Sequence, residues 1–250
     1  MRRAVLLATA VASLAACGGQ SYDSTRGAKL VDFTLHSRAV GGDLHETLVL
    51  PPLRGSGVLV VLLHGRGSDP ASFLSQPFFD ELQALGRRAP AVLLLDGGDH
   101  SYWHDRADGR WGTMVLHEAI PAGVKRTGAR HVALGGISMG GFGALDLSAR
   151  GGFCAVGAHS PALWFSAGAT APGAFDDAAD FTRHDLIAHP PDVRAPVWID
   201  VGTGDPFHDA AVALGRKLRV TVHAWPGGHE SSYWRAHMPA YLRFYARACR

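Results

Sequence analysis

Short apolar runs alternate along the chain with longer segments that have an apolar face. Residues 58–63 and 91–95 are continuously apolar, as strands buried on both faces of a sheet are. The segment between them predicts a helix over residues 70–85, with Asp69 as its N-cap and Gly86 beyond its end. Strand–helix–strand units of this kind build parallel sheets through right-handed crossovers.

The same alternation continues to the end of the chain, after an opening hairpin that turns at Gly41-Gly42. It predicts an α/β fold with a mostly parallel eight-stranded sheet, flanked by helices, in one domain over residues 29–250. The insertion at residues 160–194 is short, so a small lid or none is expected. The other predicted strands are 30–35, 44–50, 131–134, 155–158, 195–201 and 220–225, and the other predicted helices are 113–125, 142–150 and 232–248.

The N-terminus reads as an export signal. Arg2 and Arg3 precede an apolar run over residues 4–16 that is too short to span a bilayer. The run ends in Leu-Ala-Ala-Cys, which resembles the cleavage site of bacterial lipoproteins and predicts lipidation of Cys17. We therefore expect a signal peptide at 1–16, a flexible tether at 17–28, and a bacterial extracytoplasmic protein anchored to a membrane by lipid. An ordinary secretory signal is the alternative.

The charge balance excludes some partners. The chain has 24 basic and 22 acidic side chains, and cleavage after residue 16 removes two arginines, which leaves 22 of each. A neutral mature chain implies no nucleic-acid partner, and any membrane attachment would come from the lipid. Two further cysteines are Cys154 and Cys249. Outside the cytoplasm, where we expect the protein, a disulfide between them is permitted, but sequence alone leaves their pairing open.

A glycine-flanked serine is the strongest chemical signal. Residues 136–140 read Gly-Ile-Ser-Met-Gly, with an apolar strand before them and a helix after them. A nucleophilic serine at such a turn needs small neighbours, and Gly136 and Gly140 meet that need. The pattern predicts Ser138 as a nucleophile, whereas a purely structural glycine turn is the alternative.

A serine nucleophile needs a base and an acid that orients the base. His229 follows the last predicted strand, and Asp205 follows the strand before it, so both lie at the sheet edge where Ser138 is expected. We predict Ser138, Asp205 and His229 as the catalytic residues. The alternatives are Asp209 as the acid and His159 or His208 as the base, whereas His223 and His237 are expected to pack.

The oxyanion of an acyl-transfer intermediate needs backbone donors. The N–H groups of Met139, after the nucleophile, and of Arg66, after the strand 58–63, are the candidates. A substrate pocket is expected around His64, Tyr102, Trp103, Trp111 and Trp164, although backbone bonding is the simpler role for His64. The loop 99–106 contains histidines and aspartates, but its spacing matches no compact zinc signature, so no metal and no cofactor are expected.

These motifs together resemble the esterase D group of α/β-hydrolases. The resemblance rests on Leu62-Leu63-His64-Gly65, the glycine-rich segment 135–144, Gly202-x-Gly204-Asp205, and Gly228-His229 with Tyr233-Trp234. It covers the chain from about residue 33 to the C-terminus. The group includes feruloyl and acetyl esterases, S-formylglutathione hydrolase and mycolyltransferases, so it implies a serine hydrolase without a cofactor.

The resulting expectation is a serine carboxylic ester hydrolase that acts through an acyl-enzyme on a small-molecule or glycan-linked ester. Acyl transfer to a sugar or glycan is the first alternative, because the chemistry is shared up to the acyl-enzyme. A non-catalytic surface-binding lipoprotein that reuses the fold is the second. The sequence leaves the acyl group, the alcohol and the oligomeric state open.

Overall fold

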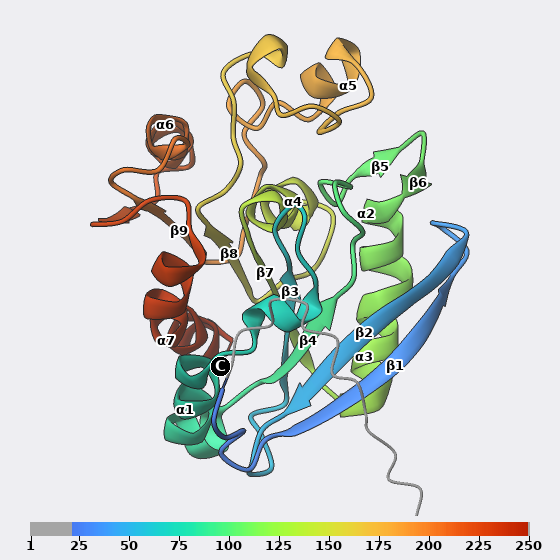
Figure 1. Ribbon diagram of the computed structural model, residues 1–250, viewed down its shortest axis with the longest axis vertical. Coiled ribbons are helices and arrows are strands. Elements are labelled where there is room, and N and C mark those ends of the chain that lie inside the picture. Colours follow the sequence, from blue (N-terminus) through green and yellow to red (C-terminus); the bar gives the residue numbers. More distant parts are fainter. Residues whose placement is uncertain (1–21, 250) are drawn as a thin grey trace, which may run out of the picture.

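The computed structural model describes residues 22–249, and their centre is one eight-stranded sheet (Figure 1). Its strand order is β1-β2-β4-β3-β7-β8-β9-β10. The strands from β4 to β10 run parallel, whereas β2 is antiparallel to both β1 and β4. The predicted α/β architecture is therefore confirmed. The strands are β1 Lys29–Ser37, β2 Gly42–Leu50, β3 Val58–Leu63, β4 Ala91–Leu95, β7 His131–Ile137, β8 Ala155–His159, β9 Val197–Gly202 and β10 Val222–Trp225.

Helices cover both faces of the sheet, which separates two apolar cores. On β3, Leu59, Val61 and Leu63 enter one core, and the alternate residues enter the other. The first core packs under α4 and α6 and beside the helical segment that ends in α3, and the second packs under α1 and α7. The helices are α1 Gln76–Leu85, α2 Trp111–Met114, α3 Ile120–Thr127, α4 Met139–Ser148, α5 Ala178–Arg183, α6 His208–Leu218 and α7 Ser231–Ala248.

Several helix boundaries differ from the predictions. The helix expected over residues 70–85 is a 3-10 turn, Pro70–Phe73, followed by α1, because Ser75 is extended and caps a new helix that has Pro77 in its first turn. A π turn, Val115–Ala119, joins α2 to α3. The sequence did not predict the short helix α5, the helix α6 or a small hairpin, whose strands are β5 Asp105–Arg106 and β6 Gly109–Arg110. None of the helices among residues 22–249 is long and apolar enough to cross a membrane.

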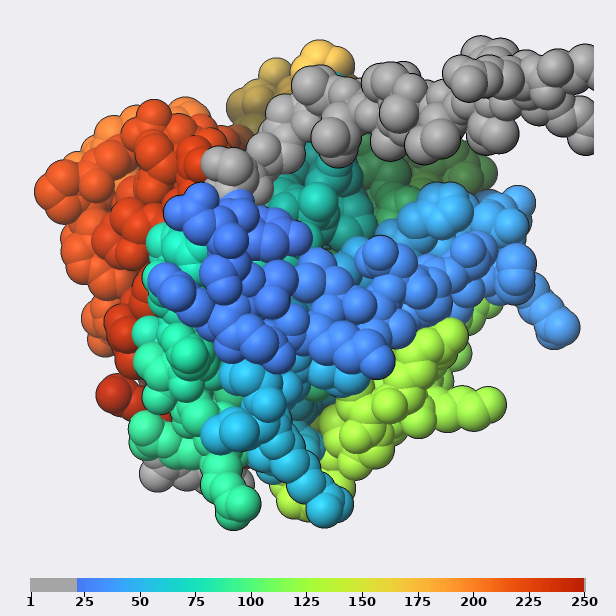
Figure 2. Space-filling model, turned by 60° about the horizontal axis from the view of Figure 1, so that its bottom comes forward, coloured from blue at the N-terminus to red at the C-terminus, as the bar shows by residue number. Residues whose placement is uncertain are grey.

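The segment that precedes β1 packs on α1. The Tyr22 ring lies 4.6 Å from that of Phe79, and Gln76 accepts hydrogen bonds from the N–H groups of residues 23 and 24. The tether predicted over 17–28 is therefore wrong for residues 22–28. The predicted signal peptide and Cys17 lie outside the described residues. In Figure 2 the β1–β2 hairpin, in blue, extends across one face between α1 and α3.

Cys154 and Cys249 form a disulfide, with their Cα atoms 5.0 Å apart. The bond connects the residue before β8 to the C-terminal end of α7, across 95 positions of sequence. Closing so long a loop restricts the unfolded chain strongly. The pairing that the sequence left open is thereby resolved.

Removing this bond is expected to lower stability. The double variant Cys154→Ala/Cys249→Ala should lose about 2–4 kcal/mol of unfolding free energy. Urea unfolding, followed by circular dichroism with and without a reductant, measures the effect. The reductant should destabilise the parent chain and leave the double variant unchanged; equal sensitivity of the two would contradict the assignment.

A buried carboxylic acid lies on β2. Glu46 is 1% exposed, and its Oε2 accepts the Asp96 N–H at 2.8 Å. Its Oε1 has no partner among the described residues. Burial raises the pKa of Glu46 to about 8, helped by the Asp96 carboxylate and opposed by the Asp96 N–H. The side chain is therefore protonated in the folded protein at neutral pH.

The raised pKa predicts a pH-dependent stability. The folded state holds a proton that the unfolded chain releases near 4.5, so this contribution is complete below that pH and is lost as the pH rises through about 8. The loss is at most about 1.4 kcal/mol per pH unit. Urea unfolding of the parent chain and of Glu46→Gln at several pH values measures it. The variant should show a shallower decline across this window, and parallel declines would contradict the prediction.

Candidate active site

Ser138 lies on a sharp turn between β7 and α4. Its backbone is in the left-handed region, with φ 57°. The turn tolerates no side chain at its two glycines: a β-carbon on Gly136 would overlap the backbone of Gly140, and one on Gly140 would overlap the Leu63 carbonyl. The strain at a non-glycine residue is typical of a nucleophile turn.

Three side chains form a hydrogen-bonded chain that ends at this serine. His229 Nε2 lies 2.8 Å from Ser138 Oγ, and His229 Nδ1 lies 2.8 Å from Asp205 Oδ2. The other carboxylate oxygen of Asp205 accepts the Phe207 N–H at 2.8 Å, which fixes the carboxylate plane. The structure thus brings together the three residues that the sequence predicted.

The loops that carry Asp205 and His229 contact each other closely. Gly204 donates its N–H to the Gly227 carbonyl at 2.9 Å, and a β-carbon on Gly202 would overlap Gly227. Aromatic rings flank the imidazole of His229, with Phe207 at 5.0 Å and Trp234 at 5.1 Å between ring centroids. The histidine therefore has little freedom to leave the serine.

Ser138 and His229 open into a cavity of about 1750 Å³. Arg66, Tyr102 and Trp164 line it, as predicted for the last two. Burial raises the pKa of Tyr102, although the neighbouring Arg66 guanidinium opposes the shift, so the phenol stays neutral. Other aromatic residues of the lining are Phe73, Phe165, Phe207 and Trp234.

The two segments that carry the predicted oxyanion donors lie beside the nucleophile. Met139 is the first residue of α4, so its N–H is one of the groups that a helix leaves without an internal partner. Gly65 approaches the turn so closely that a β-carbon there would lie 3.5 Å from Ser138 Cβ. Arg66 follows it and lines the same cavity. The backbone of this loop is therefore positioned next to the serine.

Two residues predicted for the pocket are instead fully buried. His64 donates from Nδ1 to the Gly65 carbonyl at 2.8 Å and accepts the Gly97 N–H on Nε2 at 3.0 Å. Burial lowers its pKa, so the ring is neutral. The Trp103 indole donates to the His64 carbonyl and fills the space left by Gly97 and Gly143. Both residues support the loops behind the cavity and do not line it.

Trp111 is also outside the cavity. Its indole packs on Gly98 and Gly109, and its N–H donates to Asp108 at 3.3 Å. Asp105 accepts two hydrogen bonds from Thr113 at the start of α2, each 2.7 Å long. These bonds hold the loop to α2.

The side chains of the other candidate bases and acids bond to groups other than Ser138, although the His159 carbonyl accepts the Ser138 N–H at 2.9 Å. His159 is 1% exposed and bonds to Asp200 at 2.6 Å and to the Tyr245 hydroxyl at 2.9 Å. His208 bonds to the exposed Asp209. His223 stacks on Trp198 and His237 stacks on Trp225, as packing residues do.

Sequence reasoning missed a buried polar cluster around Asp200. This carboxylate is fully buried in β9 and accepts hydrogen bonds from Trp198, Tyr233 and Tyr241 as well as contacting His159. Burial, followed by the Asp200 charge, raises the pKa of Tyr241 well above its usual value. The available signal was an aspartate within an apolar strand, since a buried carboxylate needs partners. The cluster ties α7 to the sheet beneath the His229 loop.

The sheet order and the serine turn define an α/β-hydrolase. Residues 110–245, more than half of the chain, match the family described as "Putative esterase". The chain therefore belongs to this esterase family, whose class of activity is carboxylic ester hydrolysis. No curated protein sequence matches it significantly.

Solved structures agree with this fold at low sequence identity. A ferulic acid esterase has a TM-score of 0.72 at 22% identity, with 88% of this chain and 98% of that chain covered. The S-formylglutathione hydrolase from Agrobacterium tumefaciens has a TM-score of 0.73 at 17% identity, with 92% and 99% covered. The fluorophosphonate-binding serine hydrolase F from Staphylococcus aureus has a TM-score of 0.67 at 18% identity, with 88% and 98% covered.

Proposed function

We propose that the chain hydrolyses a carboxylic ester through an acyl-enzyme on Ser138. The observation that carries this proposal is the unbroken hydrogen-bonded chain from Asp205 through His229 to Ser138, at the wall of a large cavity. A serine hydroxyl is a poor nucleophile until a neighbouring base accepts its proton. His229 Nε2 is at the distance that this proton transfer needs.

The reaction has two halves. Ser138 Oγ attacks the ester carbonyl while His229 Nε2 takes its proton, and the N–H groups of Met139 and Arg66 stabilise the oxyanion. The alcohol leaves with the proton from His229, which forms the acyl-enzyme. Water then attacks the acyl group through the same histidine and releases the acid. Asp205 holds Nδ1 protonated throughout and stabilises the imidazolium.

The aromatic lining favours an ester with an apolar or aromatic portion beside the reacting carbonyl. Such pockets bind by burial of flat apolar surface, with a few polar groups that set orientation. A panel of p-nitrophenyl esters of increasing chain length, together with feruloyl esters and acetylated xylan, tests this function. Turnover of at least one ester is expected, and no turnover above the uncatalysed rate across the panel would contradict the proposal.

Acyl transfer to a sugar or glycan is the second candidate. The cavity volume favours it, because about 1750 Å³ exceeds the roughly 300–1,000 Å³ of most ligand pockets and leaves room for an acceptor beside the acyl group. Incubation with an acyl donor and a sugar, followed by mass spectrometry, separates the two. Acylated sugar would show transfer, and free acid alone would show hydrolysis.

We also propose that the enzyme works outside the cytoplasm, anchored to a bacterial membrane by lipid on Cys17. The lipoprotein-like sequence before Cys17 supports this location. The Cys154–Cys249 disulfide supports it independently, because such bonds persist in oxidising compartments. Metabolic labelling with a fatty acid tests it: the parent chain should be labelled and a Cys17→Ala variant should not.

A further inference from the structure

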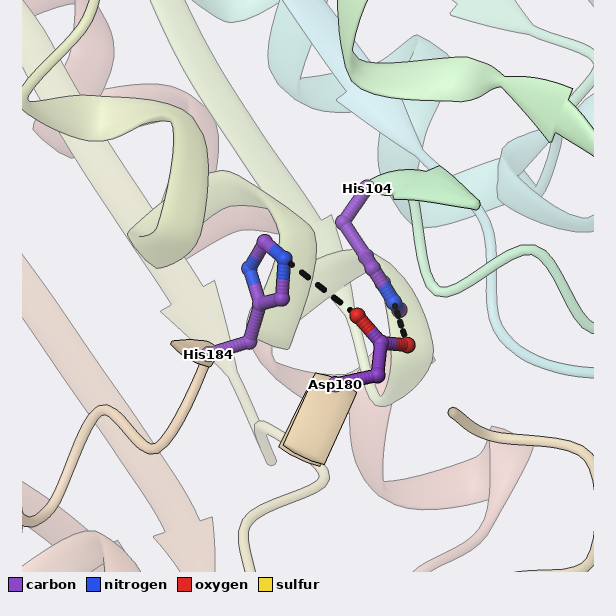
Figure 3. Close-up of side chains that lie close together, drawn as sticks. All are labelled: His104, Asp180 and His184. Atoms are coloured by element: carbon purple, nitrogen blue, oxygen red, sulfur yellow. Dashed lines mark hydrogen bonds and ion pairs between the residues drawn. The ribbon is translucent and has the colours of Figure 1, made fainter. Parts of the chain in front are cut away.

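Three metal-ligating side chains from two distant segments meet beside α4. His104 comes from the loop before β5, Asp180 lies on α5, and His184 lies directly after it (Figure 3). One potential ligand atom from each lies within 4.8 Å of the others. Asp180 and His184 are four positions apart, so both side chains face the same way at the end of this short helix.

The distances fit a small tetrahedral ion. Zinc bonds of 2.0–2.1 Å place neighbouring ligand atoms roughly 3.3 Å apart. His104 Nε2 lies 3.2 Å from Asp180 Oδ2, and His184 Nε2 lies 3.7 Å from Asp180 Oδ1. Each histidine nitrogen therefore lies near the expected spacing from one oxygen of the Asp180 carboxylate, and the two oxygens differ. His184 follows the last residue of α5, and a small shift there would bring both nitrogens to a common ion.

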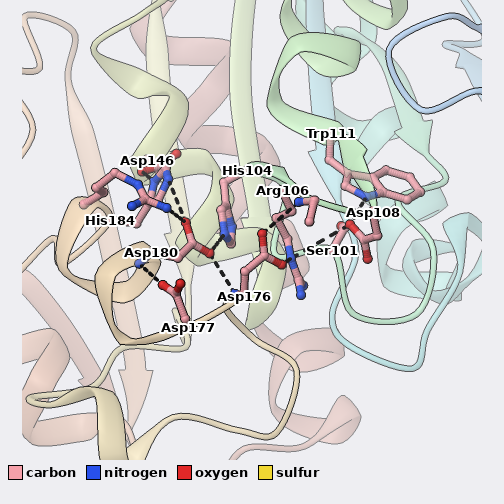
Figure 4. A network of polar contacts seen from close by, with 12 residues as sticks. Ser101, His104, Arg106, Asp108, Trp111, Asp146, Asp176, Asp177, Asp180 and His184 are labelled. Atoms are coloured by element: carbon pink, nitrogen blue, oxygen red, sulfur yellow. Dashed lines mark hydrogen bonds and ion pairs between the residues drawn. The ribbon is translucent and has the colours of Figure 1, made fainter.

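His184 is oriented as a metal-bound histidine is. His184 Nδ1 lies 2.8 Å from Asp146 Oδ1, which leaves Nε2 directed at Asp180. A carboxylate behind a histidine fixes the ring and strengthens it as a ligand. Figure 4 shows Asp146 next to His184.

Hydrogen bonding within the protein leaves the cluster incomplete. His104 is 0% exposed, yet its Nδ1 has no partner among the described residues. This atom is a different ring nitrogen from the Nε2 that faces Asp180, so it does not mark the position of the ion, which is assigned from Nε2 and the distances above.

We propose that His104, Asp180 and His184 bind a zinc ion, with water in the fourth position. Two histidines and one carboxylate suit zinc, and the Asp180 and Asp146 carboxylates balance its charge. Arg183 contacts Asp180 Oδ1 at 3.0 Å, but its side chain is 64% exposed and free to turn to solvent. The spacing of histidines and aspartates within the loop 99–106 alone predicted no metal. The proposed site combines His104 of that loop with Asp180 and His184 from another segment.

The ion would be structural, because none of its three ligands lines the cavity of Ser138. It would join the loop of His104 to the insertion at 160–194. Tyr102 and Trp164 extend from these two segments into the cavity wall, with 5.6 Å between their rings. Zinc would therefore hold the two sides of the substrate cavity together.

Calorimetric titration with zinc chloride tests the proposal on chain purified without a histidine tag and stripped with EDTA. We expect one zinc per chain and a higher melting temperature with zinc. His184→Ala should weaken binding at least about 100-fold, and Asp146→Asn about 10–100-fold. His189→Ala, an exposed histidine of the same insertion, is the matched control and should bind normally.

Two outcomes would overturn the site. One is the absence of stoichiometric zinc binding by the stripped parent chain, which would leave an ordinary hydrogen-bonded cluster. The other is equal zinc affinity in the parent chain and in His184→Ala, which would place the ion elsewhere. Asp146→Asn gives a second variant outside the ligand set if His184→Ala fails to fold. Zinc binding is measured without turnover, so failure here is distinct from failure of the esterase proposal.

Discussion

Ser138→Ala is expected to lower kcat/KM for p-nitrophenyl acetate by roughly 10⁴- to 10⁶-fold. The hydroxyl is the atom that His229 Nε2 contacts at 2.8 Å, and no other group replaces it at the turn. Without it, only oxyanion stabilisation and binding remain to assist direct attack by water. Initial rates with p-nitrophenyl acetate, corrected for spontaneous hydrolysis, measure the loss.

The fold should survive this change. Alanine keeps the β-carbon at Ser138, and the backbone bonds of the turn, such as Phe142 N–H to the Ser138 carbonyl at 3.0 Å, stay in place. Circular dichroism and the melting temperature should match the parent chain. Ser166→Ala, an exposed serine of the insertion, serves as the control and should keep its activity. Activity of Ser138→Ala within tenfold of the parent would contradict the assignment.

Asp205→Asn is expected to lower kcat on the order of 10⁴-fold. The asparagine oxygen would still accept the Phe207 N–H, so its amide nitrogen would face His229 Nδ1. An N–H donor there forces Nδ1 to be the acceptor and moves the ring proton to Nε2. A histidine protonated at Nε2 cannot take the proton of Ser138. The variant thus loses activity because His229 adopts the wrong tautomer, while the shape of the site is kept.

Asp209→Asn is the matched control for this variant. Asp209 was the rival acid in the sequence, but its side chain is 92% exposed, and among the described residues it bonds to His208 and not to His229. Steady-state kinetics of both variants with the same ester separate the two acids. Asp209→Asn should stay near parent activity; a large loss there, with Asp205→Asn active, would reverse the assignment.

The sheet was predictable because its strands are buried on both faces. Residues 58–63 and 91–95 are apolar throughout, and β3 and β4 have these bounds in the structure. Helix starts were less predictable. The helix expected from residue 142 begins at Met139 in the structure. The glycines at 140 and 141 suggested a turn, but they lie within α4, where close packing against Leu63 and Pro161 requires glycine. The extended backbone at Ser75 likewise divides a segment that periodicity alone joins.

The positions of the proposed catalytic residues were predictable from chain order, whereas the cavity wall was predictable only in part. Strand-end loops converge at one edge of a parallel sheet, which suffices to place Asp205 and His229 near Ser138. No such rule says which aromatic residues of a long loop face solvent. Trp103 turns inward because Gly97 and Gly143 leave room for its indole. That match is three-dimensional, and the sequence shows only the glycines.

Labelling with a fluorophosphonate, followed by peptide mass spectrometry, shows directly whether Ser138 is an activated nucleophile. The probe forms a covalent bond only with a serine that a base activates, so it reports the Ser138–His229 contact without choosing a substrate. We expect one modified residue, Ser138, and loss of labelling in His229→Ala. Modification of another serine, or no modification of the folded chain, would contradict it.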